Sequence, residues 1–205
     1  MIKILGSIPK DVTLACSGGP DSMAILDFLV SGKKNVTVAH FDHGTAHGRH
    51  ARNFVVEYCR VKNIPIQVGI CTDKKDPDKS PEEWWRDCRY SFFKNVPGTI
   101  VMGHHLNDVA EWWLFSSVNG NPKLIPYKND KVIRPFLTTK KEEFMSWCDR
   151  KNVPFVTDPS NSEEKYCRSR IRNNIMPEIL QVNPGFLTVL EKKVRQDFRE
   201  NYENV

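Results

Sequence analysis

Strand-like and helix-like segments alternate along the first half of this chain, and this alternation constrains the fold more than any other feature. Apolar runs typical of strands alternate with helical spacing of apolar residues, at 12–16, 22–30, 36–41, 49–62, 64–70, 81–94 and 99–103. Parallel strands need crossover connections of this length. The pattern predicts an α/β fold with a five-stranded parallel sheet and helices on both faces, in which residues 131–136 lead into or form the fifth strand.

Turn residues mark where later helices begin. Ser80 and Pro81 are typical of an N-cap followed by the first helical position. Thr139 is expected to cap a helix that runs to residue 151. The length of 205 residues suits one full domain and a short extension. We therefore expect a sheet domain over 1–138 and a helical extension over 139–205 that packs on it.

Composition limits the class of protein. Apolar residues make up 40% of the chain, enough for one core, and no apolar run approaches the ~20 residues of a membrane helix. The N-terminus does not resemble a secretion signal, so we expect a cytoplasmic protein without a membrane partner. The net charge of +5 is compatible with nucleic acid. The six cysteines include no C-x-x-C pair, which argues against a zinc ribbon or a paired redox motif.

A glycine-rich hexapeptide, residues 17–22, follows the first expected strand and opens the first helix. Two glycines there let backbone N–H groups converge on an anion, and a helix start adds partial positive charge. Two serines supply hydroxyl donors. Asp21 would repel a phosphate unless Mg²⁺ lies between them. The alternative is an ordinary glycine turn in which Asp or Ser caps the helix.

Polar side chains also gather after the fourth expected strand. His104 and His105 stand where ligands bind in open parallel sheets, beyond the carboxyl ends of the strands. Asp108 and Glu111 lie one helical turn apart on the next helix. This group could hold Mg²⁺ or orient an amine. The alternative is that Asn107 caps that helix.

Two groups of arginines suggest anion binding. Arg86 and Arg89 share a helix face, which suits a phosphate or a carboxylate, although they could also pair with nearby acids in solvent. Arg168 and Arg172 lie four residues apart in a basic run and are typical of a contact with a phosphate backbone. The alternative for that run is a solvated helix face.

The hexapeptide Ser-Gly-Gly-Pro-Asp-Ser resembles the pyrophosphate-binding loop of the N-type ATP pyrophosphatases. Further segments are similar to motifs of the tRNA(Ile)-lysidine synthetases, with Asn107 in place of the first Asp of the third. They are H-x-x-H-G at 40–44, E-x-x-x-R-x-x-R-Y at 82–90, H-H-x-D-D-x-x-E at 104–111, R-P-L-L at 134–137, D-x-S-N at 158–161 and R-N-x-I-R at 168–172. The chain is thus identified as a minimal, divergent member of that family without its C-terminal domains.

The resemblance implies a fold like that of the adenine nucleotide alpha hydrolases and a ligase activity. ATP with Mg²⁺ would adenylate the C2 oxygen of the first anticodon cytidine of tRNA(Ile) with a CAU anticodon, releasing pyrophosphate. A lysine amine would then displace AMP. Oligomeric state is left open, a homodimer included.

The resemblance also implies roles for individual residues. Those expected to bind ATP are Cys16, Ser17, Gly18, Gly19, Asp21, Ser22, His40, Phe41, Arg89 and Gly103. Those expected to be catalytic are Asp21, Arg86, His104, His105 and Asp108, with Asp21 also on the metal. Those expected to bind lysine or tRNA are Glu111, Arg134, Asn161, Arg168 and Arg172.

The sequence is also compatible with two other functions. One is another adenylating enzyme of the same superfamily that acts on a different base or a small molecule. The other is a catalytically degenerate module that binds ATP or RNA without turnover, which Asn107 favours. Retention of every polar residue in the hexapeptide argues against the second.

Overall fold

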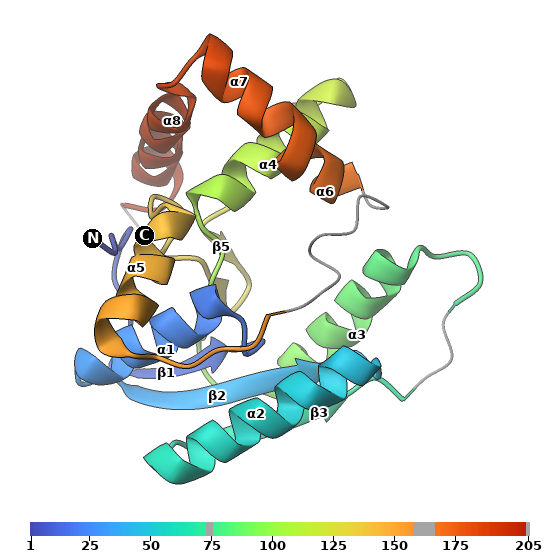
Figure 1. Ribbon diagram of the computed structural model, residues 1–205, viewed down its shortest axis with the longest axis vertical. Coiled ribbons are helices and arrows are strands. Elements are labelled where there is room, and N and C mark those ends of the chain that lie inside the picture. The colour runs from blue at the N-terminus through green and yellow to red at the C-terminus, as the bar shows by residue number, and fades with distance from the viewer. Residues whose placement is uncertain (73–75, 158–166, 204–205) are drawn as a thin grey trace. The chain divides into compact units, whose positions relative to one another are not determined.

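The computed structural model describes residues 1–72, 76–157 and 167–203. Contacts divide the chain into two compact units, which we describe separately (Figure 1). The sheet unit comprises Ile8–Met102 and Trp147–Thr157, and the helical unit comprises Met1–Ser7, Gly103–Ser146 and the described part of 158–205. The division predicted at residue 138 stays a prediction.

The sheet unit is built on four parallel strands in the order β3-β2-β1-β4. They are β1 (Asp11–Ala15), β2 (Asn35–Asp42), β3 (Ile66–Ile70) and β4 (Ile100–Met102). Leu14 of β1 lies opposite Val38 of β2 and Val101 of β4, and all three are fully buried. Burial decreases toward the edge strand β3, where Val68 and Ile70 are exposed.

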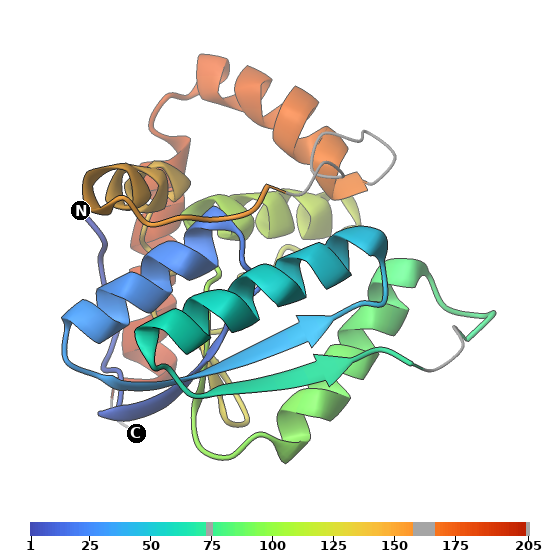
Figure 2. The ribbon, with the colours of Figure 1, turned by 60° about the horizontal axis from the view of Figure 1, so that its bottom comes forward.

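Three helices connect the strands: α1 (Pro20–Ser31), α2 (Ala46–Lys62) and α3 (Pro81–Asn95). The first two lie on one face of the sheet and α3 lies on the other (Figure 2). Right-handed crossovers require this, because the chain moves outward from β1 to β3 and then back across to β4. The α/β fold with helices on both faces is therefore confirmed, as is the cap of α3, where Ser80 Oγ accepts from Glu83 N at 3.2 Å.

The helical unit contains a short hairpin and the remaining helices. Its elements are α4 (Leu106–Val118), β5 (Lys128–Asn129), β6 (Val132–Ile133), the start of α5 (Lys141–Lys151), α6 (Cys167–Arg170), the π-helix η2 (Ile171–Ile175), α7 (Met176–Val182) and α8 (Phe186–Asn201). The helix α4 packs against α6, η2 and α8. Leu106 and Ala110 of α4 form a buried cluster with Met176 and Leu190.

The prediction of five strands is wrong, because the described residues form a sheet of six. The prediction that residues 131–136 lead into or form a strand is confirmed, because β6 lies within them, and the additional strand is β5, which pairs antiparallel with β6. The connection between them is a tight turn in which Asp130 has a φ of +52°. A turn this short can join only antiparallel neighbours, since a parallel pair needs a crossover.

The predicted cap of α5 is also wrong. Thr139 Oγ1 instead exchanges two hydrogen bonds with the backbone of Lys3, at 2.8 and 2.9 Å. The first N–H of α5, on Lys141, is donated to the side-chain oxygen of Asn107 at 3.0 Å. Asn107 therefore does cap a helix, but it caps α5 rather than α4, the helix to which it belongs.

No helix within 1–72, 76–157 or 167–203 combines the length and the apolar character that crossing a membrane requires.

We expect Asn107→Ala to lower the free energy of unfolding by about 1 kcal/mol, the usual cost of removing a helix cap. Asn107→Asp is the matched control, because the carboxylate keeps the acceptor and places negative charge at a helix start, where it is favourable. Urea denaturation of the two variants and the unchanged chain measures both effects. An Asp variant as unstable as the Ala variant would contradict the capping role.

Candidate functional sites in the two units

The loop between β1 and α1 depends on Gly18. Its φ is +89°, and a Cβ there would lie 3.0 Å from Val55 and 3.2 Å from Val156. The Gly18 carbonyl also accepts from Val156 N at 2.9 Å. Any other residue would be strained by the left-handed backbone and would crowd both valines. The loop is thus fixed in place by α2 and by the segment that ends at Thr157.

The start of α1 is arranged to receive an anion. Its N-cap is Gly19, which has no side chain with which to cap the helix. Ser22 Oγ donates to the Gly19 carbonyl at 3.0 Å and lies 3.3 Å from Ser17 Oγ. The two hydroxyls brace the turn, and Asp21 stands in the first turn of the helix. The ends of helices of this kind attract phosphate through N–H groups and the helix dipole.

Two buried groups lie directly behind the loop. His40 is 2% exposed, and its Nδ1 donates to the Cys16 carbonyl at 2.9 Å. Burial lowers the pKa of His40, although the Cys16 carbonyl and Asp42 oppose this shift, so the ring is neutral. Nε2 is then an acceptor, and it is buried without a hydrogen-bond partner among the described residues. Burial also raises the pKa of Cys16, which keeps its thiol protonated.

An aromatic group follows at the end of β2. The ring of His43 lies 5.1 Å from that of Phe41 and 5.4 Å from that of Trp85 on α3. Burial, followed by the positive charge of Arg89, lowers the pKa of His43 to about 4. His43 is therefore an uncharged ring near neutral pH. Phe41 and Arg89 therefore both lie close to His43.

An ion pair that no sequence motif indicated supports this region. Asp42 is buried, its Oδ2 lies 3.1 Å from Arg52 Nη1, and its Oδ1 accepts from Gly44 N at 2.8 Å. A Cβ on Gly48 would lie closer to Asp42 Oδ1 than any real contact allows. Gly48 lies inside α2, where glycine is unfavourable, and this was the available signal of a close approach.

The two arginines of α3 do not act as a pair. Arg89 is half-buried and near enough to His43 to affect its pKa. Arg86 is exposed, and its guanidinium lies 4.8 Å above the ring of Tyr90. Arg89 is thus placed at the carboxyl end of β2 with the other candidate residues, whereas Arg86 covers its own helix.

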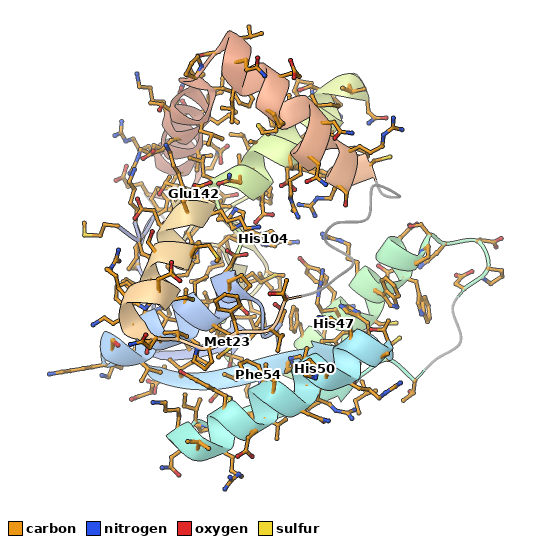
Figure 3. The ribbon with its side chains drawn as sticks, viewed as in Figure 1. Met23, His47, His50, Phe54, His104 and Glu142 are labelled. Carbon is orange, nitrogen blue, oxygen red and sulfur yellow. The ribbon has the colours of Figure 1, made fainter. Side chains whose placement is uncertain are left out.

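In the helical unit, His105 is the N-cap of α4. Its Nδ1 accepts from Asp108 N at 3.2 Å, and Asp108 Oδ2 accepts from His105 N at 3.0 Å. This reciprocal pair is a capping box. Because Nδ1 accepts here, the ring proton of neutral His105 is on Nε2. His104 lies beside it, just before the helix and after Gly103 (Figure 3).

The carboxylate of Asp108 is held in its ionised form. Burial by itself raises the pKa of Asp108. The charges of His105 and His104, the His105 N–H and the charge of Arg168 each lower it. Their combined effect is larger than that of burial, so the pKa of Asp108 is lowered. A carboxylate with a lowered pKa is a poor proton acceptor and a good partner for a cation. The site therefore favours binding of positive charge.

Glu111 is paired with the arginines of the basic run. It is 2% exposed and receives two hydrogen bonds from Arg172, at 2.6 and 3.0 Å. Arg168 is more loosely placed, 3.5 Å from Asp108 Oδ1 and 3.6 Å from Glu111 Oε2. Arg168 and Arg172 thus both meet the acids of α4.

Arg172 belongs to the π-helix η2. Met176 N donates to the Ile171 carbonyl, a spacing of five residues. Pro177 follows, and it has no N–H to donate to the carbonyl four residues earlier. The proline explains the wider turn, and π-turns are frequent at functional sites.

Two other predicted residues lie elsewhere. Arg134 is 3% exposed, and its Nη1 donates to the Pro126 carbonyl at 2.8 Å, so it holds the chain around the β5–β6 hairpin. Asn161 falls outside the described residues, together with the rest of its D-x-S-N segment.

Mg²⁺ bound here would be held partly by protein side chains and partly by the oxygen atoms of a bound phosphate group. No group of three His, Cys, Asp or Glu side chains in the described ranges could form a complete metal site. His47 and His50, for example, project from α2 with ring centroids 6.5 Å apart (Figure 3). Mg²⁺ is commonly held by one or two carboxylates plus phosphate oxygens. Asp21, at the helix start, provides such a carboxylate.

Comparison with known proteins agrees with this architecture. A family model described as a PP-loop domain matches residues 4–179. The tRNA(Ile)-lysidine synthase of Thermotoga maritima is 36% identical over 192 residues, covering 85% of this chain and 46% of that protein. The tRNA(Ile)-lysidine synthase of Bacillus licheniformis is 31% identical over 212 residues, covering 92% and 42%. The chain thus spans less than half the length of these curated relatives.

One solved structure is similar in fold alone. It is the NH3-dependent NAD synthetase from Campylobacter jejuni in complex with the nitrate ion, with a TM-score of 0.51 and 12% sequence identity. The match covers 98% of this chain and 91% of that one.

We expect the stability of the fold to depend on pH through His43. Its pKa falls from 6.5 to about 4 on folding, so the unfolded chain takes up the proton first as the pH decreases. The stabilisation from neutral His43 is therefore complete above about pH 6.5 and is lost as the pH falls toward 4. Urea unfolding across this range should show a pH slope that is smaller by about one proton in His43→Asn.

The exposed His50→Asn is the matched control for this measurement. His40 contributes its own slope in both variants, so the comparison isolates His43. Equal slopes in the two variants would contradict the assignment.

Proposed function

The chain belongs to the PP-loop domain family, and we propose that it is an ATP-dependent tRNA-modifying ligase that forms lysidine. The observation that carries the proposal is the loop over residues 16–22, where Gly18 forms a left-handed turn and α1 begins without a side-chain cap. The similarity to lysidine synthases over 85% of this chain supports the choice of reaction. Because those relatives are more than twice as long, activity and substrates are proposals for this chain.

In the first step, the C2 oxygen of the target cytidine attacks the α-phosphorus of ATP, and the bond to the bridging oxygen of the β-phosphate breaks. Pyrophosphate leaves with the electron pair of that bond. The N–H groups at the start of α1, with Ser17 and Ser22, would hold it. Asp21 would hold Mg²⁺, which neutralises phosphate charge when bound. Catalysis of this kind is mainly positioning and charge stabilisation.

The nucleoside of ATP would lie beside the residues at the end of β2. His40 and His43 are neutral rings, so they offer polar and aromatic contacts without a fixed charge. Phe41 contributes a half-buried aromatic surface, and Arg89 supplies the positive charge. We propose that Arg86 acts on an outer phosphate or on RNA, because it is exposed.

In the second step, an uncharged lysine amine attacks C2, AMP leaves with the oxygen, and the proton released from the new C–N bond passes to solvent. We propose that Asp108 and Glu111 hold the other, positively charged amine of lysine, with His104 and His105 shaping the site. The lowered pKa of Asp108 supports binding of a cation rather than removal of a proton. Arg172 would orient Glu111, and the looser Arg168 would contact tRNA. We also propose that Arg134 and Asn161 belong to the tRNA-binding part of the site.

The remaining parts of the proposal concern context. We propose tRNA(Ile) with a CAU anticodon as the RNA, the cytoplasm as the location, and no membrane partner. A homodimer remains open. The degenerate binding module is the second candidate, but the observation that favoured it has another cause. Asn107 is explained by its cap on α5, and an amide oxygen does this as well as a carboxylate.

Lysine transfer tests the proposed function directly. The protein is mixed with ATP, Mg²⁺, labelled lysine and an unmodified tRNA(Ile) transcript with a CAU anticodon, and label in the RNA is counted while pyrophosphate is assayed. We expect RNA-bound label that requires ATP, and a transcript with a CAC anticodon is the control. Pyrophosphate without label would instead support a different base or amine, and ATP binding without either product would support the inactive module.

We expect Asp21→Ala to lower pyrophosphate release by about 100-fold or more, the usual effect of losing one group that stabilises transition-state charge. The exposed Asp149→Ala is the matched control for loss of a carboxylate. Urea unfolding should show that neither variant loses its fold. Release at the wild-type rate in Asp21→Ala would remove Asp21 from the metal site.

A further inference from the structure

Two cysteine thiols meet at the edge of the sheet unit. Cys71 follows the last residue of β3, and Cys88 lies in the middle of α3. The thiol of Cys71 donates to Cys88 Sγ across 3.5 Å, although the residues are 17 positions apart. Neither is in a disulfide in this structure, and both are partly exposed. The sequence pattern indicated no redox pair, because no C-x-x-C is present.

The two thiols are held by different elements. Cys71 N donates to the Asp42 carbonyl at 2.8 Å, which continues the pairing of β2 with β3 by one residue. Cys88 is on α3, one residue before Arg89 and three after Trp85. A bond between the sulfurs would therefore tie α3 to the carboxyl end of the sheet, where His43 contacts Trp85.

The geometry allows such a bond with a small movement. Disulfide sulfurs are about 2.05 Å apart, so the present separation would close by about 1.5 Å. Partly exposed side chains near the end of a strand and on a surface helix can move this far without repacking a core. The ring that would close is short, and it would restrain the unfolded chain as well as the folded one.

We propose that Cys71 and Cys88 are a redox modification site that forms a reversible intrachain disulfide. A low-molecular-weight disulfide of the glutathione type is the oxidant. The thiolate of one cysteine attacks a sulfur of that disulfide and expels one thiolate, giving a mixed disulfide. The second cysteine, after losing its proton, attacks the protein sulfur and expels the other thiolate. Two protein thiols are oxidised, and one small disulfide is reduced to two thiols.

The other cysteines provide internal controls. Cys16, Cys59 and Cys148 are buried, and burial raises the pKa of all three thiols, to about 12 for Cys59 and about 11 for Cys148. Their thiolates are therefore scarce near neutral pH, and thiolate is the reactive form. Cys167 is exposed on α6 and lies in the helical unit. It is the cysteine most open to mixed disulfides, so it needs its own variant.

The test is oxidation of the intact Cys167→Ser chain with oxidised glutathione at pH 8, followed by mass spectrometry. We expect a loss of two hydrogens with no retained glutathione, and a disulfide-linked peptide pair that contains Cys71 and Cys88. Dithiothreitol should reverse both changes. Cys71→Ser and Cys88→Ser in the same background should each retain one glutathione at the remaining cysteine. Cys59→Ser should behave as the Cys167→Ser chain does.

A second readout separates a crosslink at this site from oxidation elsewhere. Amide hydrogen exchange in α3 should slow by about tenfold or more on oxidation, since the crosslink opposes local opening of that helix. Exchange in α8, which is in the helical unit, should not change. The proposal is overturned if oxidation leaves glutathione on both cysteines, links either one to a different cysteine, or forms the bond without slowing α3.

Discussion

Parallel pairing of β1 between β2 and β4 is the constraint on which the rest of the sheet unit depends. Because the strands run the same way, the residues that follow β1 and those that end β2 emerge at the same edge. Pairing continues past the strand, where Cys16 N donates to the Ala39 carbonyl at 3.0 Å. The Cys16 carbonyl then fixes the proton of His40 on Nδ1. One register thus places the loop over residues 16–22 and sets the tautomer of His40 behind it.

The groups with shifted pKa values near the candidate sites differ in charge between the two units. In the sheet unit, burial lowers the pKa values of His40 and His43, so the rings near the loop are uncharged. In the helical unit, Asp108 keeps its charge because neighbouring histidines and Arg168 outweigh the cost of burial. Neutral rings suit a nucleoside, and a charged carboxylate suits an amine.

Several polar side chains at the candidate sites accept hydrogen bonds from backbone N–H groups. His105 caps α4, Asn107 caps α5, and Asp42 receives the N–H of Gly44. Buried helix starts must be satisfied in this way, because an unpaired N–H is costly. Histidine is an unusual N-cap, so its place in a motif gave no indication of that role. These three residues therefore have structural roles, and a chemical role is proposed only for His105.

The sequence by itself determined the α/β class, the strand–helix alternation, the loop at residues 17–22 and the cap at Ser80. These depend on local periodicity and turn chemistry, which are visible in one stretch of chain. Only the tertiary structure decided that β6 pairs antiparallel with β5, that Asn107 caps a distant helix and that Glu111 pairs with Arg172. It also brought Cys71 beside Cys88. The physical reason is that these contacts, apart from the local β5–β6 hairpin, join residues that are far apart along the chain, where no periodic signal connects them.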